Sequence, residues 1–152
     1  MVILDTLGFL FGTWRIARAI EDHRSETCGS FDGMATLTKK TTHRDTARGM
    51  RARYEEAGEM RLGGYVGQAC RLLEYRREAN DDPRLMLHFT DGRPFVDLDL
   101  RSGAWQSIHL CGDDRYEIAT FVRSHDLVQE RWRVRGPTKD YDATTALRRV
   151  PR

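Results

Sequence analysis

The sequence predicts an all-β fold: a closed antiparallel up-and-down barrel of about eight to ten strands with a short N-terminal helix. Hydrophobic and polar side chains alternate along most of the 152-residue chain, which is the period of a strand with one buried face. Short apolar runs end in turn-forming residues at a spacing of about 8 to 12 residues. No linker or repeat divides the chain, so we expect one domain over residues 1–152.

The N-terminal elements are the helix and the first strand. Residues 3–11 are the only good helix candidate and stop at Gly12, and residues 13–22 then alternate as a strand. This alternation puts Arg18 on the same face as apolar side chains. Those apolar side chains are Trp14, Ile16 and Ile20.

Three further strands are expected in the first half of the chain. A turn at residues 25–29 leads into a second strand that ends near residue 41, with its apolar residues on one face. A third strand, residues 47–56, ends in a turn at Ala57-Gly58-Glu59. The fourth covers residues 61–78; its part 68–78 also fits a short helix, and we expect a strand because Tyr, Val, Cys and Leu are abundant.

The second half is clearer, because each apolar run ends in explicit turn residues. The turns contain Gly, Pro, Asp or Ser, which separate hairpin strands for known conformational reasons. The expected strands are residues 85–90, 94–100, 105–110, 116–123, 127–136 and 141–150.

Charge and cysteine content restrict the class of protein. The formal net charge is only +2, so neither nucleic acid nor an anionic membrane is an expected partner. The N-terminus has no basic region before its apolar residues, and Asp5 interrupts them, so we expect neither a secretory signal nor a spanning helix. Three widely spaced cysteines without a C-x-x-C pattern predict free thiols and a cytoplasmic protein.

A G-x-W motif, Gly12-Thr13-Trp14, opens the first strand, and the last strand ends in Arg148 and Arg149. With the short preceding helix, this arrangement resembles the calycin superfamily of lipocalins and fatty-acid-binding proteins. The resemblance implies that one arginine packs over Trp14 at the closed end of the barrel. Residues 7–11 would then close that end.

Further motifs resemble an uncharacterised, mostly bacterial domain-of-unknown-function family with a lipocalin-like fold, which implies architecture but no activity. The chain departs from that pattern after the Asp91-Gly92-Arg93 turn, where Pro94-Phe95-Val96 stand in place of an expected histidine. A mechanism that needs that histidine is therefore not expected. The motifs are YEEAG (54–58), FTDGRPF (89–95), HLCGDDRY (109–116) and WRVRGPTKDY (132–141).

Polar residues on inward faces suggest that the barrel encloses a small, largely apolar molecule with a polar or anionic end. Arg18 on an apolar face needs a carboxylate partner or an anionic ligand, unless it reaches water at the rim. The ligand-lining candidates are Arg18, Tyr75, His88, Cys111, Trp132 and Tyr141.

Acid–base chemistry is the catalytic hypothesis. Histidine is the side chain whose ordinary pKa lies near neutrality, so His109 is the residue expected to move a proton, together with Tyr54, Glu56 or Tyr116. Cyclisation or isomerisation of an enclosed substrate fits better than hydrolysis, because no nucleophile triad stands out. The alternative for the tyrosines is a core or rim position with backbone partners.

His109 and Cys111 share a face but are too few to hold a metal unless His88 joins them. We expect a buried thiol beside an imidazole, with no metal and no cofactor. Two other classes stay open: a carrier or sensor of a metabolite, a fatty acid or haem bound through His88 or His109, and an interaction module with a filled barrel. A small molecule is the expected partner, and a homodimer is left open.

Overall fold

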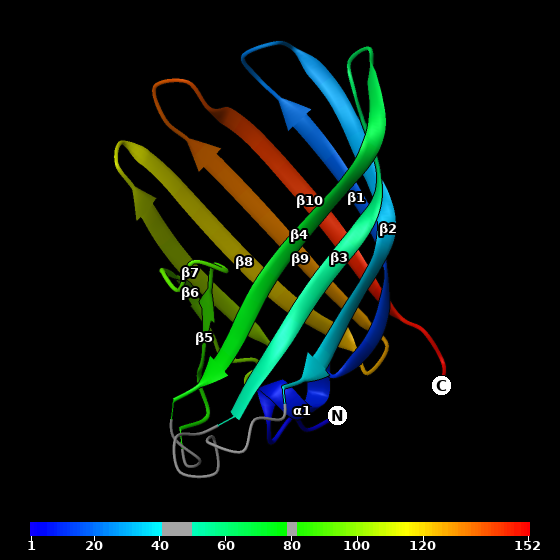
Figure 1. Ribbon diagram of the computed structural model, residues 1–152, viewed down its shortest axis with the longest axis vertical. Coiled ribbons are helices and arrows are strands. Elements are labelled where there is room, and N and C mark those ends of the chain that lie inside the picture. Colours follow the sequence, from blue (N-terminus) through cyan, green and yellow to red (C-terminus); the bar gives the residue numbers. More distant parts are fainter. Residues whose placement is uncertain (41–49, 79–81) are drawn as a thin grey trace.

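The computed structural model describes residues 1–40, 50–78 and 82–152. Ten antiparallel strands form one sheet that curls into a nearly closed barrel (Figure 1), which confirms the expected fold class. The elements are α1 (Thr6–Leu10), β1 (Gly12–Asp22), β2 (Thr27–Lys39), β3 (Met50–Leu62), β4 (Tyr65–Arg77), β5 (Leu85–His88), β6 (Pro94–Leu98), β7 (Ala104–Cys111), β8 (Asp114–Ser124), β9 (Leu127–Arg135) and β10 (Asp140–Arg149).

Strands that follow one another in the chain pair with each other, except β6 and β7, and β1 also pairs with β10. The sheet order β6-β5-β4-β3-β2-β1-β10-β9-β8-β7 leaves β6 and β7 as its two edges. Side chains join these edges: Ser107 Oγ donates to the Asp97 carboxylate at 2.7 Å, and Trp105 Nε1 donates to the Asp97 carbonyl oxygen at 3.1 Å. We call this contact between β6 and β7 the seam.

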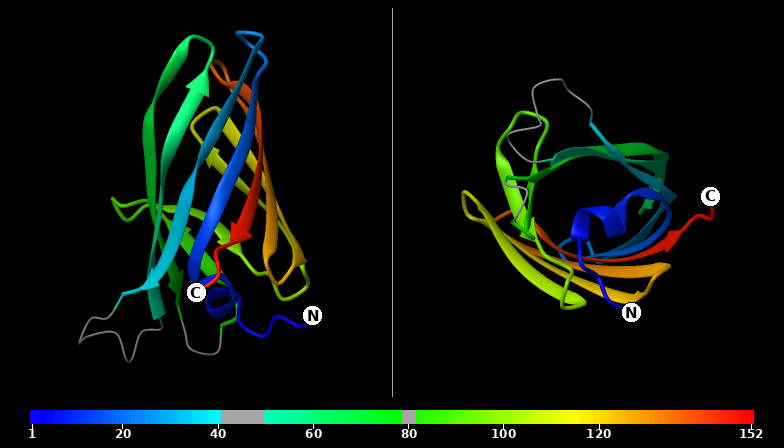
Figure 2. Two further views of the ribbon diagram at one scale, coloured as in Figure 1. Left: turned by 90° about the vertical axis from the view of Figure 1, so that its right-hand side faces the viewer. Right: turned by 90° about the horizontal axis from the view of Figure 1, so that it is seen from below.

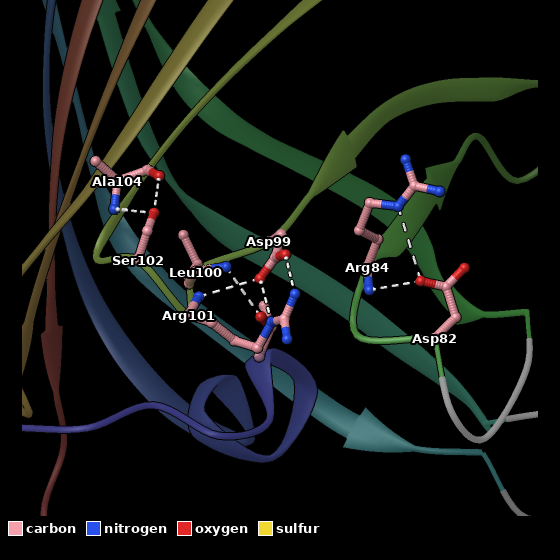
Figure 3. A network of polar contacts seen from close by, with 8 residues as sticks. Asp82, Arg84, Asp99, Leu100, Arg101, Ser102 and Ala104 are labelled. Carbon is pink, nitrogen blue, oxygen red and sulfur yellow. Dashed lines mark hydrogen bonds and ion pairs between the residues drawn. The ribbon is translucent and has the colours of Figure 1, made fainter.

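Helix α1 lies across the lower end of the barrel (Figure 2). Asp5 caps it by accepting a hydrogen bond from the Leu7 N–H, as an N-cap carboxylate does. Figure 3 shows the β6–β7 connection beside α1: the Leu100 N–H donates to Thr6 Oγ1 at 2.9 Å, and Arg101 pairs with Asp99. The helix is shorter than the expected residues 3–11. None of the helices in the described ranges is long and apolar enough to cross a membrane.

Arg149 closes the lower end over Trp14. Its guanidinium carbon lies 4.1 Å from the indole centroid, and its N–H groups donate to the carbonyl oxygens of Phe9 at 2.8 Å and Phe11 at 3.2 Å. Trp14 is 3% exposed. The expected cation–indole contact is confirmed, and the arginine that makes it is Arg149.

The turn expected at Ala57-Gly58-Glu59 is wrong, because β3 runs straight through it. Gly58 pairs with Gly33 of β2, and a Cβ placed on Gly58 would lie 2.2 Å from the carbonyl oxygen of Asp32. The glycine marks a close approach of two strands, which is the other meaning of glycine inside a strand. The hairpin turn lies instead at Gly63-Gly64, where Gly63 has a φ of +59°.

The boundary of the first hairpin also differs. The first hairpin turns at residues 23–26, so Gly29 belongs to β2 rather than to the turn. Residues 68–77 lie within β4 and are a strand, as expected. The start of the expected third strand, residues 47–49, and residue 41 of the second lie outside the described residues.

Apolar side chains fill the lower half of the barrel, above α1. Strand alternation aims them inward, and the Trp14 face of β1 is buried as expected. The largest fully buried apolar side chains are Leu7, Ile16, Phe31, Leu85, Leu100, Val128 and Val134. The upper half is different, because charged and aromatic side chains join the aliphatic ones there.

Candidate ligand-binding site

A cavity of about 530 Å³ opens at the end of the barrel away from α1, near the β1–β2, β3–β4 and β9–β10 turns. Its wall mixes aliphatic, aromatic and charged side chains. They include Ile20, Met60, Leu62, Arg71, Trp132 and Tyr141. A void of about 50 Å³ lies in the apolar lower part and reaches Tyr54, Tyr75 and Glu130. Arg71 and Trp132 line both spaces.

Arg18 and Glu56 form a buried ion pair across the lumen. Arg18 donates to both carboxylate oxygens, at 2.8 and 3.2 Å, and its Nε donates to Thr145 Oγ1 at 2.8 Å. The two side chains are 8% and 3% exposed. Of the alternatives for Arg18, the structure therefore shows a carboxylate partner rather than a position in water at the rim.

Tyr54 extends this network. Its hydroxyl donates to Glu56 Oε2 at 2.7 Å, and burial together with the Glu56 charge raises its pKa well above the ordinary value. Burial alone would raise the pKa of Glu56, but the hydrogen bond from Arg18 and the charge of Arg71 hold it below its ordinary value. Tyr75 stacks on Tyr54 at 5.4 Å between centroids, and burial raises its pKa.

Arg71 is the cation at the junction of the cavities. It faces Glu56 in the β3–β4 register, with Nε 3.7 Å from Glu56 Oε1, and its guanidinium carbon lies 4.6 Å from the Trp132 ring centroid. Its side chain is 36% exposed. Within the described ranges, its N–H groups donate no hydrogen bond to the protein, so they are available to a molecule in the cavity.

Glu130 is a second acidic group in the lumen wall. It accepts a hydrogen bond from Trp132 Nε1, is half-buried, and lines the lower void. Burial raises its pKa, although the positive charges of Arg18 and Arg71 act in the opposite direction. A carboxyl enclosed without a direct cationic partner favours its neutral form.

His109 and Tyr116 lie together beside the main cavity. They face each other in the β7–β8 register, with ring centroids 5.8 Å apart, and both line a side cavity of about 280 Å³ that shares Arg71, Trp132 and Tyr141 with the main one. Lys139 Nζ donates to the Tyr116 hydroxyl at 2.8 Å. This bond, with the nearby Asp114, raises the pKa of Lys139.

The candidate catalytic residues thus form two groups. Tyr54 and Glu56 belong to the Arg18 network, whereas His109 and Tyr116 belong to the side cavity. Trp132 lies between the groups, because it packs 6.2 Å from the Tyr116 ring and carries Arg71 on its face.

His88 lies apart from both groups, whereas Cys111 lines the side cavity with His109 and Tyr116. One ring nitrogen of His88 lies 3.2 Å from the Met86 carbonyl oxygen, and Cys111 is exposed at the end of β7, next to the side cavity. The expectation of a buried thiol is wrong, because β7 is an edge strand and the thiol lies on its outer end. Among the described residues, the grouping of three metal-ligating side chains is Glu21, His23 and Asp142, not His88 with His109 and Cys111.

The sequence analysis did not select Arg71 or Glu130. A signal was present in both cases: Arg71 is four residues before Tyr75 on one strand, and Glu130 is two residues before Trp132 on another. Alternation puts both on the inward face. They were overlooked because charge-rich runs usually lie on solvated faces.

Residues 10–149 match a family described as "Family of unknown function (DUF6314)". The chain belongs to that family. This DUF6314 member therefore belongs, as expected, to an uncharacterised family. Comparison with curated protein sequences finds none that matches.

Solved structures with a similar fold include an S-type phycobiliprotein lyase, CPES, from Guillardia theta. It is 10% identical, with a TM-score of 0.73, and the match covers 100% of this chain and 94% of the lyase chain. A redesigned beta barrel, mFAP1, bound to DFHBI matches with a TM-score of 0.45 and 9% identity, over 94% of this chain and 97% of that one. The lyase similarity shows that this DUF6314 protein shares its barrel fold.

Proposed function

We propose that this protein binds one small, largely apolar organic molecule in the upper cavity and that an anionic group of the molecule contacts Arg71. The cavity volume of about 530 Å³ is within the roughly 300–1,000 Å³ of small-molecule sites. Its aliphatic and aromatic wall suits an apolar body, and its few convergent polar groups suit one charged end.

The observation that carries the proposal is the contrast between the two lumen arginines. Arg18 is neutralised by Glu56 through two hydrogen bonds. Arg71 stacks on Trp132 and lies 3.7 Å from Glu56, donates no hydrogen bond to the protein within the described ranges, and lines the cavity. A planar guanidinium held by an aromatic face is pre-organised for a carboxylate or similar anion. The barrel fold shared with a phycobiliprotein lyase is compatible with a ligand in the lumen.

A pair of fluorescent probes tests this proposal. Anilinonaphthalene sulfonate carries a sulfonate on an apolar skeleton, and N-phenylnaphthylamine is the same skeleton without the charge. We expect Arg71→Met to weaken binding of the sulfonate by about tenfold to a hundredfold, the equivalent of a lost charged hydrogen bond, and to leave the neutral probe nearly unchanged. Trp132 fluorescence should be quenched by both probes.

Arg133→Met is the matched control, because Arg133 follows Trp132 on β9 and is exposed. It should leave both affinities unchanged. Equal weakening by the two arginine variants, or sulfonate binding that is indifferent to Arg71→Met, would contradict an anion site in the cavity.

Proton transfer to a bound molecule is a second candidate function, favoured by the placement of His109 beside Tyr116 in the connected side cavity. Such proton transfer would support cyclisation or isomerisation. We assign it to His109 rather than to Glu56, because the lowered pKa of Glu56 makes that carboxylate a poor base near neutrality. The role of Tyr54 and Glu56 in proton transfer stays a prediction.

Native mass spectrometry of protein from its own host would identify a retained ligand. Incubation of that ligand with wild-type protein and with His109→Gln then separates the two functions. An isomerase loses turnover in the variant and keeps its affinity. If the wild-type protein returns the ligand unaltered, the protein is a carrier or sensor rather than an isomerase.

A further inference from the structure

Glu130 interacts with charged and titratable groups from β1, β3 and β4, while the strands paired with its own, β8 and β10, place uncharged threonines beside it. Its register partners are Thr120 on β8 and Thr145 on β10. The groups whose charges act on it, or on which its charge acts, are Arg18 on β1, Tyr54 and Glu56 on β3, and Arg71 and Tyr75 on β4, with the Trp132 indole on its own strand.

The net charge of this set of groups depends on whether Glu130 is ionised or protonated. Arg18 and Arg71 are cations and Glu56 is a carboxylate, so the set is neutral when Glu130 is ionised and has one positive charge when Glu130 is protonated. An anion bound at Arg71 reverses this relation, because the site with ligand is neutral only when Glu130 carries its proton. An uncompensated charge in an enclosed site is costly.

We propose that Glu130 determines the specificity of the site for anions by carrying a proton when the ligand is bound. The inference rests on the proposed function. The step takes one proton from solvent onto the Glu130 carboxylate as the anion docks against Arg71, so an anion and a proton enter together and no other bond changes. A neutral ligand gains nothing from this proton.

The direction of the pH dependence follows from the same geometry. Burial already raises the pKa of Glu130, and Arg18 and Arg71 oppose this. A bound anion partly cancels the Arg71 charge, so it raises the pKa of Glu130 further. Anion affinity is therefore highest in acid and falls as pH rises through the pKa of the ligand-free carboxyl, by up to about tenfold per pH unit.

The test compares the pH profiles of wild-type protein and Glu130→Gln between about pH 5 and pH 9. Glutamine keeps the shape of the side chain and an acceptor for the Trp132 indole but holds no charge. The sulfonate probe stays ionised throughout, so its own titration does not contribute. We expect its affinity to fall with pH in the wild type and to lose that fall in Glu130→Gln. The affinity for N-phenylnaphthylamine should not change with pH in either protein.

Calorimetry of the wild-type protein alone gives a second measurement, because proton uptake makes the heat of sulfonate binding depend on the ionisation enthalpy of the buffer. Identical pH profiles in the two proteins, with Arg71 still required, would overturn the role of Glu130 and leave the proposed function intact. Sulfonate binding indifferent to Arg71→Met would overturn both.

Discussion

Arg149 packs over Trp14, with its guanidinium carbon 4.1 Å from the ring centroid, and the preceding residue, Arg148, is exposed on the same strand. Arg149 also donates to two carbonyl oxygens at the end of α1. We expect Arg149→Met to lower the free energy of unfolding by about 2–3 kcal/mol. Arg148→Met should change it by less than about 0.5 kcal/mol. Urea denaturation measures both, and equal effects would contradict the capping role.

Removal of the Glu56 charge should destabilise the barrel strongly, because it leaves Arg18 buried without a counter-ion. We expect Glu56→Gln to cost about 3–5 kcal/mol. The exposed Arg53–Glu55 pair on the same strand supplies the control, since Glu55→Gln should cost less than about 1 kcal/mol. The double variant Arg18→Met with Glu56→Gln should recover part of the loss; a purely additive result would show that the two residues do not interact.

The stabilising effect of Glu56 should disappear in acid. Its pKa is lowered in the folded protein, so its contribution is fully present above the unfolded-state carboxyl pKa and is lost as pH falls through the folded-state pKa. The difference in unfolding free energy between wild type and Glu56→Gln should therefore narrow as pH is lowered. A difference that stays constant with pH would argue against an ionised Glu56 in the folded state.

Glu130 should change the unfolding free energy with pH in the opposite direction. Its pKa is raised by burial, so above the unfolded-state pKa the folded protein holds a proton that the unfolded chain has released. Stability is then lost as pH rises, at about 1.4 kcal/mol for each unit by which the pKa is raised. Glu130→Gln should be more stable relative to wild type at neutral pH than in acid. Thermal unfolding across pH detects this, and a parallel response of the two proteins would refute it.

Gly58 should tolerate no side chain. A Cβ there meets the Asp32 carbonyl oxygen, so Gly58→Ala must displace β2 from β3 and should cost about 1–3 kcal/mol. Gly64 in the β3–β4 turn has nothing within 4 Å of such a Cβ. Gly64→Ala should be nearly neutral, and comparable losses at both positions would show that backbone flexibility, not space, decides the effect.

Strand alternation and the spacing of the turns predict the barrel, and alternation places Arg18 on its apolar face. It could not identify Glu56 as the partner, because that residue is 38 positions away and its alignment with Arg18 depends on the registers of β1 with β2 and of β2 with β3. The turn at Gly58 was predicted wrongly for a different reason. A glycine that allows close approach of two strands and a glycine that forms a turn look alike in a sequence.

The candidate site was predicted in part. Trp132 and Tyr141 line the upper cavity, and Tyr75 lines the lower void. The polar residues divide into a Glu56 group and a His109 group because their strands occupy different positions on the circumference of the barrel. Local pattern does not contain that information, because it reports the face of a strand but not its neighbours across the lumen.

The seam makes the circumference of this barrel adjustable at one place. Separating most adjacent strands would break a ladder of backbone hydrogen bonds, whereas β6 and β7 are joined by the side chains of Asp97, Trp105 and Ser107. Widening is least costly there, beside Phe95 and His109. A molecule too large for the cavity would therefore widen the barrel between β6 and β7 rather than between two strands joined by backbone hydrogen bonds.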